Sequence, residues 1–121
     1  MTPHILFVDD EAPIRELLSL YFRKKGLEVT TAISAGQAKE LAASVPFTLA
    51  ILDLNLAGEN GLELLGFFKG NYPNVPVIIF TGQNLPAVQE QELSQRVKAV
   101  VRKTESLSAL YDEVCRHLPH E

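Results

Sequence analysis

The sequence predicts a doubly wound α/β sandwich, a fold in which helices cover both faces of a five-stranded parallel sheet. Two observations predict it. Short apolar runs alternate along the chain with longer segments whose apolar residues recur at the spacing of one helix face. The connections between successive runs are also long enough for the crossover helices that parallel strands require. At 121 residues the chain has the length of one domain, so we expect residues 1–121 to form a single domain.

Five segments carry the pattern of a strand. Three of them are nearly unbroken apolar runs, which is typical of strands buried on both faces of a sheet. Residues 28–32 alternate between apolar and polar side chains and suit a strand near an edge. The predicted strands are, in chain order, residues 4–8, 28–32, 48–53, 75–81 and 99–102.

Five helical segments alternate with these strands. The first ends in a basic turn followed by Gly26, a common helix stop. Ser34 is a candidate N-cap for the second, with Gln37 completing a capping box. The fourth has only a thin apolar stripe. The predicted helices are residues 11–25, 34–43, 61–71, 86–95 and 106–117.

Composition excludes several classes of protein. Lys and Arg number 11 against 15 Asp and Glu, a formal net charge of −4, so the whole chain offers no general attraction to nucleic acid or anionic lipid. The single cysteine, Cys115, excludes an internal disulfide and a multi-cysteine metal site. No apolar run approaches the ~20 residues of a membrane span, and the N-terminus does not resemble a signal peptide. We therefore expect a cytoplasmic protein that contacts neither membrane nor nucleic acid directly.

Polar residues stand where the predicted strands end. Ligands of open parallel sheets bind outside the carboxyl ends of the strands. At these ends are Asp9 with Asp10, then Asp53, Thr81 and Lys103. Taken singly, each has a structural explanation, such as a helix cap for an aspartate or a turn at Asp53. Their joint placement at one edge of one sheet favours a functional site.

Clustered carboxylates repel one another and favour a bound cation. The donors are oxygens without His or Cys nearby, so Mg²⁺ fits better than Zn²⁺. The histidines are poorly placed as ligands, at the start of the first strand (His4) and near the C-terminus (His117 and His120). Three carboxylates, one Mg²⁺ and one lysine sum to about zero charge, and such a site suits a phosphoryl group.

Short motifs at these strand ends resemble those of a known family. They are Val8-Asp9-Asp10-Glu11, Leu52-Asp53-Leu54-Asn55-Leu56, Gly58 with Gly61, Phe80-Thr81-Gly82 and Arg102-Lys103. No single motif is specific, but together and in this order they resemble the receiver domain of two-component response regulators. The resemblance covers residues 5–118 and implies a CheY-like fold with the flavodoxin-like strand order 2-1-3-4-5.

The resemblance implies a phosphorylation chemistry. Asp53 would be the phosphoacceptor, whose carboxylate attacks the phosphorus of a phosphohistidine. Lys103 would contact a phosphoryl oxygen, and Thr81 would donate its hydroxyl once the phosphoryl group arrives. Gly82 carries no side chain that could obstruct that approach.

The resemblance also implies a metal site. Mg²⁺ would be bound by the side chains of Asp10 and Asp53 and by the backbone carbonyl of Asn55. Asp9 would act through water. Mg²⁺ and positioning would let the domain catalyse its own phosphorylation and autodephosphorylation, which makes it a switch rather than a turnover enzyme.

The resemblance implies particular partners in a bacterial phosphorelay. The phosphoryl donor would be a sensor histidine kinase or a His-phosphotransfer protein, and the signal would pass to an output domain or partner protein. A homodimer would use the face formed by residues 86–95, 99–102 and 106–117.

The sequence departs from the family pattern at three positions. Thr104 follows Lys103 where the family usually has proline, commonly after a cis bond, and we expect a trans bond here. Ala57 stands where proline is frequent. Val100 replaces the usual aromatic switch residue, so the output mechanism is expected to differ while the phosphorylation chemistry is kept.

Three other functions compete with this interpretation. An aspartate-nucleophile phosphatase would need a second carboxylate where the chain has Asn55. A flavodoxin-like cofactor binder would need a Gly/Ser/Thr-rich phosphate loop where the chain has Asp9-Asp10-Glu11. A pseudo-receiver, which serves protein interaction without accepting phosphate, remains the main alternative.

Overall fold

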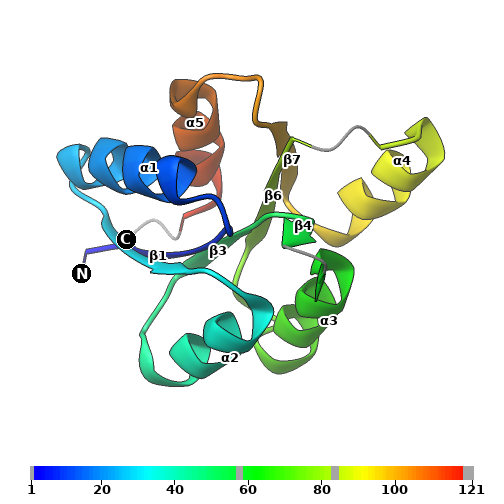
Figure 1. Cartoon of the computed structure of the whole chain (residues 1–121), viewed down its shortest axis with the longest axis horizontal. Helices are drawn as coiled ribbons and strands as arrows, with labels where there is room; N and C mark the ends of the chain where they lie inside the picture. Colours follow the sequence, from blue (N-terminus) through cyan, green and yellow to red (C-terminus); the bar gives the residue numbers. More distant parts are fainter. Residues whose placement is uncertain (1, 57–58, 83–84, 119–121) are drawn as a thin grey trace.

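Five parallel strands form one sheet in the order β2-β1-β3-β6-β7 (Figure 1). A computed structural model of the chain describes residues 2–56, 59–82 and 85–118. The strands of the sheet are β1 (His4–Val8), β2 (Glu28–Ala32), β3 (Leu49–Leu52), β6 (Val77–Thr81) and β7 (Ala99–Arg102). Because β6 and β7 are its fourth and fifth strands in chain order, the doubly wound fold and the order 2-1-3-4-5 are confirmed.

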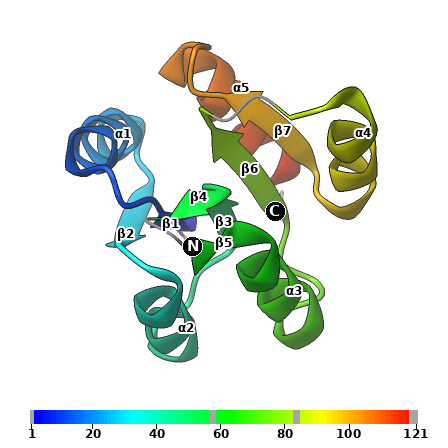
Figure 2. The same ribbon diagram turned by 45° about the vertical axis from the view of Figure 1, so that its right-hand side comes forward.

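Helices cover both faces of this sheet. Figures 1 and 2 show α1 and α5 on one face and α2 and α3 on the other, with α4 beside β7. The helices are α1 (Ala12–Lys24), α2 (Ala35–Ser44), α3 (Gly61–Asn71), α4 (Ala87–Arg96) and α5 (Leu107–His117). Each predicted helix therefore has a counterpart whose ends lie within a residue or so of the predicted ends.

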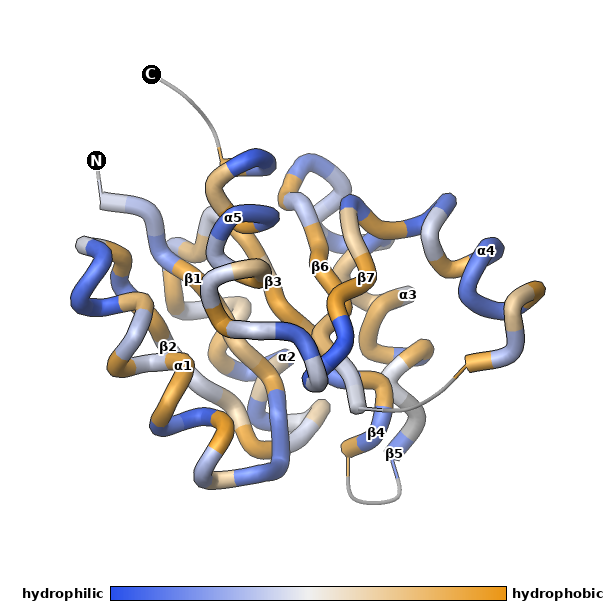
Figure 3. Tube along the Cα trace, turned by 90° about the horizontal axis from the view of Figure 1, so that it is seen from above, coloured by the Kyte–Doolittle hydropathy of each residue, from blue (hydrophilic) through white to orange (hydrophobic). Residues whose placement is uncertain are grey.

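The sheet separates two apolar clusters. Successive side chains of a strand point to opposite faces, so Ile5 and Phe7 of β1 pack with α1 and α5, whereas Leu6 and Val8 pack with α2 and α3. All four side chains are fully buried. Figure 3 shows the apolar character of β1, β3 and β6 beside the more hydrophilic α4. Burial on both faces explains why the central strands read as unbroken apolar runs.

Local signals fix several helix ends. The Ser34 side chain accepts a hydrogen bond from the Gln37 backbone N–H at 3.1 Å, as an N-cap does. The Gln37 side chain, however, accepts from the backbone N–H of Ile33 rather than from that of Ser34, so the capping box is displaced by one residue. Gly26 has φ +88°, which a residue with a side chain adopts only with strain, and it ends the turn after α1.

Some strand bounds differ from those expected. The fourth strand begins at Val77 instead of residue 75, because Pro76 has no N–H to donate to the ladder; its carbonyl still accepts from the Ala50 N–H. The third strand covers Leu49–Leu52, one residue shorter at each end than predicted. A small antiparallel hairpin of β4 (Asn55–Leu56) and β5 (Glu59–Asn60) precedes α3 and was not predicted.

In the part of the chain that the structure describes, no helix combines the length and the apolar character needed to cross a membrane.

Candidate functional site

The carboxyl end of β1 carries the first part of the site. Asp9 follows Val8 directly, and its backbone N–H donates to the Ala32 carbonyl at 3.0 Å, which fixes the residue at the end of the sheet. The Asp9 Oδ1 atom accepts from the Glu11 backbone N–H at 2.9 Å. The Arg15 guanidinium donates to the Asp9 carbonyl at 2.8 Å from the first turns of α1. The side chain of Asp9 is thus held in one place and fully buried.

Asp53 occupies the corresponding place after β3. Its backbone N–H donates to the Val8 carbonyl at 3.1 Å, so Asp9 and Asp53 leave neighbouring strands at the same level. The Asp53 Oδ1 atom accepts from the backbone N–H of Asn55 at 3.2 Å. Asp53 is only 2% exposed, so few directions remain from which a reactant can reach its carboxylate.

Lys103 joins the carboxylates from the end of β7. Its ammonium nitrogen lies 2.8 Å from Asp53 Oδ2, 2.8 Å from Asp9 Oδ2 and 2.9 Å from Glu11 Oε1. Burial alone would lower the pKa of Lys103, but its hydrogen bonds to Asp53, Asp9 and Glu11 outweigh burial and raise the pKa above the ordinary value. Lys103 therefore stays protonated throughout the neutral range.

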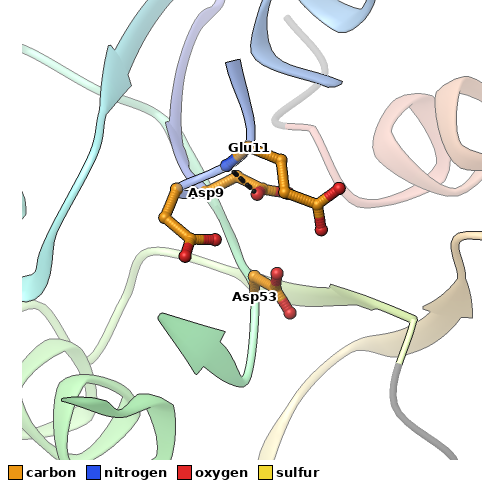
Figure 4. A group of neighbouring side chains, drawn as sticks. Asp9, Glu11 and Asp53 are labelled. Carbon is orange, nitrogen blue, oxygen red and sulfur yellow. Dashed lines mark hydrogen bonds between the residues drawn. The ribbon is translucent and has the colours of Figure 1, made fainter. Parts of the chain in front are cut away.

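The carboxylates are close enough to share one cation. One oxygen from each of Asp9, Asp10, Glu11 and Asp53 lies within 4.8 Å of the others. Figure 4 shows Asp9, Glu11 and Asp53 gathered where β1 and β3 end. One lysine offsets only one of these four negative charges, so the cluster retains a strong negative potential.

The environment of Asp9 indicates that the acidic cluster can hold a cation. Burial raises the pKa of Asp9, although its hydrogen bonds to Lys103 and Glu11 act in the opposite direction. Its Oδ2 atom is buried, and among the described residues only the Lys103 ammonium approaches it, at 2.8 Å and in poor hydrogen-bond geometry. A buried carboxylate oxygen with spare lone pairs, beside three further carboxylates, is a donor set for a hard divalent ion such as Mg²⁺.

Thr81 and Gly82 complete the edge. Thr81 is the last residue of β6 and is fully buried, and its carbonyl accepts from the Lys103 backbone N–H at 2.8 Å. A Cβ atom placed on Gly82 would lie 3.6 Å from the Lys103 side chain, an ordinary contact. The structure thus has room for a small side chain at Gly82 beside Lys103, and the expectation that glycine keeps the approach of Thr81 clear stays a prediction.

Gly61 is a glycine that the site requires. A Cβ atom there would lie 2.6 Å from the Leu54 Cα atom and 2.7 Å from the Asp53 carbonyl oxygen. Both are backbone atoms, so they cannot move aside cheaply. The start of α3 therefore packs directly against the backbone that carries Asp53.

The structure assembles the predicted residues and adds one. Asp9, Asp10, Asp53 and Lys103 lie together, with Thr81 on the adjoining strand end. Glu11 was not among the predicted site residues, yet it contacts Lys103. Its place in the same tripeptide after β1 was the available signal.

The positions that depart from the family pattern have identifiable environments. The Lys103–Thr104 peptide bond is trans, as expected. Val100 is partly buried against the cluster on the α2 and α3 face. Arg102, directly before Lys103, forms an ion pair with Glu90 of α4 at 2.7 Å. Ala57 and Gly58 lie outside the described residues.

Comparison with known proteins identifies the family. Residues 5–115 match the family model of the response regulator receiver domain. The chain is 32% identical over 117 residues to the response regulator protein FleR of Pseudomonas aeruginosa, which covers 97% of this chain and 25% of FleR. It is 37% identical over 89 residues to the transcriptional regulatory protein AruR of the same organism, covering 69% of this chain and 36% of AruR.

Solved structures agree with the sequence relatives. The response regulator protein TrrA of Thermotoga maritima, in complex with Mg²⁺ and BeF, superimposes with a TM-score of 0.84 at 29% identity, covering 95% of this chain and 98% of TrrA. A response regulator receiver protein of Pseudomonas putida gives a TM-score of 0.88 at 25% identity, covering 97% and 98% of the two chains. The chain spans a quarter to about a third of the length of the curated relatives FleR and AruR, and it belongs to the family of receiver domains of two-component response regulators.

Proposed function

We propose that Asp53 is the phosphoacceptor of this receiver domain. One observation carries the proposal: the Asp53 carboxylate is almost fully buried, and it is held between the Asn55 backbone N–H at Oδ1 and the Lys103 ammonium at Oδ2. Asp9 is also buried, but its Oδ1 atom accepts from the Glu11 backbone N–H, its Oδ2 atom pairs with Lys103, and its strand β1 lies next to the edge strand β2. Asp53 follows β3, the central strand of the sheet, so its carboxylate stands at the middle of the row of strand ends.

The transfer uses a phosphoryl group bound to a histidine nitrogen of the partner. An Asp53 carboxylate oxygen forms the new O–P bond while the N–P bond breaks, and the electron pair of the broken bond stays on the imidazole nitrogen, which then takes up a proton. Water later attacks the acyl phosphate and restores Asp53 with release of inorganic phosphate. Both steps proceed in line and depend chiefly on positioning and charge stabilisation.

Mg²⁺ is the cation that we assign to the acidic cluster. Asp10 and Asp53 would hold it by their side chains, Asn55 by its carbonyl, and Asp9 through water. When bound, the ion neutralises charge that builds up on the phosphoryl oxygens. Without it, four carboxylates repel an incoming phosphoryl group, and Lys103 alone cannot offset them.

Lys103 and Thr81 recognise the transferred group. In the unphosphorylated protein Lys103 forms ion pairs with both Asp53 and Asp9, at 2.8 Å each. After transfer the acyl phosphate offers terminal oxygens that carry more charge than the original carboxylate, so the ammonium moves its hydrogen bonds to them. Thr81, at the adjoining strand end, donates its hydroxyl to another of these oxygens.

A mass measurement tests the proposal. The protein is incubated with a small acyl phosphate donor and Mg²⁺, and the intact mass is recorded. We expect a gain of one phosphoryl group, abolished in Asp53→Asn. Asp112→Asn, an exposed aspartate of α5, is the matched control and should react normally. A normal gain of mass in Asp53→Asn would disprove the assignment, and no gain in the wild type would favour the pseudo-receiver.

Asp10 tests the metal assignment separately. We expect Asp10→Ala to remove Mg²⁺ binding and phosphorylation together while the far-UV circular dichroism stays unchanged. Phosphorylation of Asp10→Ala at the wild-type rate would show that the cation is held by other residues.

The partners follow from the family. Response regulators receive their phosphoryl group from histidine kinases, and the longer curated relatives of this chain carry further sequence beyond the part that matches. We propose a sensor histidine kinase or a His-phosphotransfer protein as donor and an output domain or partner protein as recipient of the signal. A homodimer through α4, β7 and α5, a cytoplasmic location and autodephosphorylation complete the proposal.

A further inference from the structure

A polar cavity lies at the end of the sheet opposite the acidic cluster. It has a volume of about 440 Å³ and is formed where α3, α4 and α5 end and where β6 and β7 begin. β6 and β7 run side by side and parallel (Figure 2), so the length of both strands separates this cavity from Thr81 and Lys103. We call it the basic cavity. Its lining consists of Lys69, Pro73, Asn74, Val75, Pro76, Val77, Gln95, Arg96, Val97, Lys98 and His117.

The charge of the lining is unusual for this chain. Lys69, Arg96 and Lys98 contribute three cations and no Asp or Glu takes part, although acidic residues outnumber basic ones by 15 to 11 in the whole sequence. None of the three cations has an ion pair within the described residues. At the rim, His117 Nε2 lies 3.7 Å from the Glu113 Oε2 atom.

Helix ends explain only part of this charge. Lys69, Arg96 and His117 stand in the last turns of their helices, where cations offset the partial negative charge of about half a unit at each C-terminus. Three such ends amount to roughly −1.5 charges, against +3 from Lys69, Arg96 and Lys98. Lys98 lies outside any helix. The surplus of about one to two positive charges therefore remains for a ligand.

We propose that the basic cavity binds a small phosphate-bearing anion. A cavity of this volume accommodates a small molecule, and the surplus charge matches one phosphate group, which carries between one and two negative charges at neutral pH. Arg96 and the two lysines can each donate charge-assisted hydrogen bonds to phosphate oxygens. The Asn74 and Gln95 amides provide neutral donors beside them. The site is independent of phosphorylation at Asp53.

The test measures binding in buffer freed of divalent cations, where the acidic cluster repels phosphate. Isotope-labelled protein is titrated with inorganic phosphate, with glycerol phosphate and with acetate, and amide chemical shifts are recorded. We expect saturable shifts near Val77 and Lys98 with both phosphates and much weaker shifts with acetate. Shifts with inorganic phosphate but not with glycerol phosphate would indicate an adventitious ion only and would overturn the proposal, as would shifts centred on Asp53 and Lys103.

A pair of variants separates a ligand site from helix stabilisation. Lys69 and Lys24 are both exposed lysines in the last turn of a helix, but only Lys69 lines the basic cavity. Lys69→Gln should weaken phosphate binding about tenfold, which is the loss of one charge-assisted hydrogen bond, and Lys24→Gln should leave it unchanged. Equal weakening in both variants would show that phosphate responds to overall charge, and no weakening in either would show that Lys69 does not contact the phosphate; each result would refute the site.

Discussion

Lys103 and Asp9 show how single residues can serve the site at a cost to the stability of the fold. Lys103 contacts three of the four clustered carboxylates, so its ammonium offsets part of the negative charge that a divalent cation would otherwise balance alone. Asp9 is fully buried, and this burial raises the pKa of its carboxyl group. A carboxylate kept in such a place costs stability, and proteins keep that cost where the charge has a function.

We expect Asp9→Asn to be more stable than the wild type in the absence of metal, by about 1 kcal/mol in the free energy of unfolding. Because the folded-state pKa of Asp9 is raised, folded protein takes up this proton more readily than the unfolded chain. The cost of the charge is therefore full above the raised pKa and vanishes below the ordinary value of 3.8. Urea unfolding at several pH values, with metal removed, measures the difference.

The stability gained by Asp9→Asn over the wild type should shrink as the pH falls through the raised pKa of Asp9. Asp112→Asn provides the baseline, since an exposed aspartate should change stability by no more than about 0.5 kcal/mol. A gain in Asp9→Asn that stays constant from neutral pH to below 3.8 would contradict this account.

The elements could be predicted from sequence to different degrees. Strands β1, β3 and β6 were readable because burial on both faces leaves almost no polar position in them, apart from His4 and Thr81 at strand ends. The hairpin of β4 and β5 was not, since two-residue strands are too short to show any periodicity. The carboxylates could be grouped because strand ends share an edge. The contact of Glu11 with Lys103 could not be predicted, because it depends on the length and direction of two side chains 92 residues apart.

The start of α3 gives a test with an internal control. Gly61→Ala places a Cβ atom against the backbone of Asp53 and Leu54, and we expect a loss of about 1–3 kcal/mol in stability. Phosphorylation should slow as well, because the Asp53 backbone has to move. Gly66→Ala in the same helix meets nothing within 4 Å and should gain about 0.5–1 kcal/mol from helix propensity. Chemical unfolding and the mass assay measure both effects, and a stable, fully active Gly61→Ala would refute the close contact.

Helix α4 is the element best placed to respond to phosphorylation. Within it Leu93 is the buried residue, so its packing is thin and its local stability should be low. The ion pair of Glu90 with Arg102 ties it to the residue before Lys103. Because Val100 offers no ring to rotate, we infer that movement of Lys103 reaches α4 through this connection.

Amide hydrogen exchange checks this route. With a beryllium fluoride mimic of the phosphoryl group and Mg²⁺, we expect protection to change between Leu85 and Gln95 while α2 stays unaffected. Glu90→Gln should speed exchange in α4 of the unphosphorylated protein, whereas Glu92→Gln, an exposed carboxylate of the same helix, should not. Uniform exchange of α4 in both states would exclude the route.

At the scale of the whole molecule, the sheet divides the protein into two cores. Ile5 belongs to the cluster under α1 and α5, and Ile79 belongs to the cluster under α2 and α3. They also lie on strands that are not neighbours. Ile5→Val and Ile79→Val should each cost about 0.5–1.5 kcal/mol, and their effects should add within about 0.5 kcal/mol in the double variant.

A control pair of isoleucines lies on one face of the sheet. Ile51 and Ile78 stand opposite each other on β3 and β6 and share one cluster, so their double substitution should deviate from additivity. Calorimetric or urea unfolding of both sets gives the coupling energies. Stronger coupling across the sheet than within one face would mean that the two cores respond as one.

Independent cores have an evolutionary consequence. A substitution beneath α1 and α5 can be compensated by a neighbour in the same layer, without a matching change beneath α2 and α3. Each layer can then diverge at its own pace while the strand ends between them stay in register. Homologues of this chain should show correlated substitutions within a layer and few between layers, so that a surface on one side can adapt to a new partner while the other side keeps its ancestral sequence.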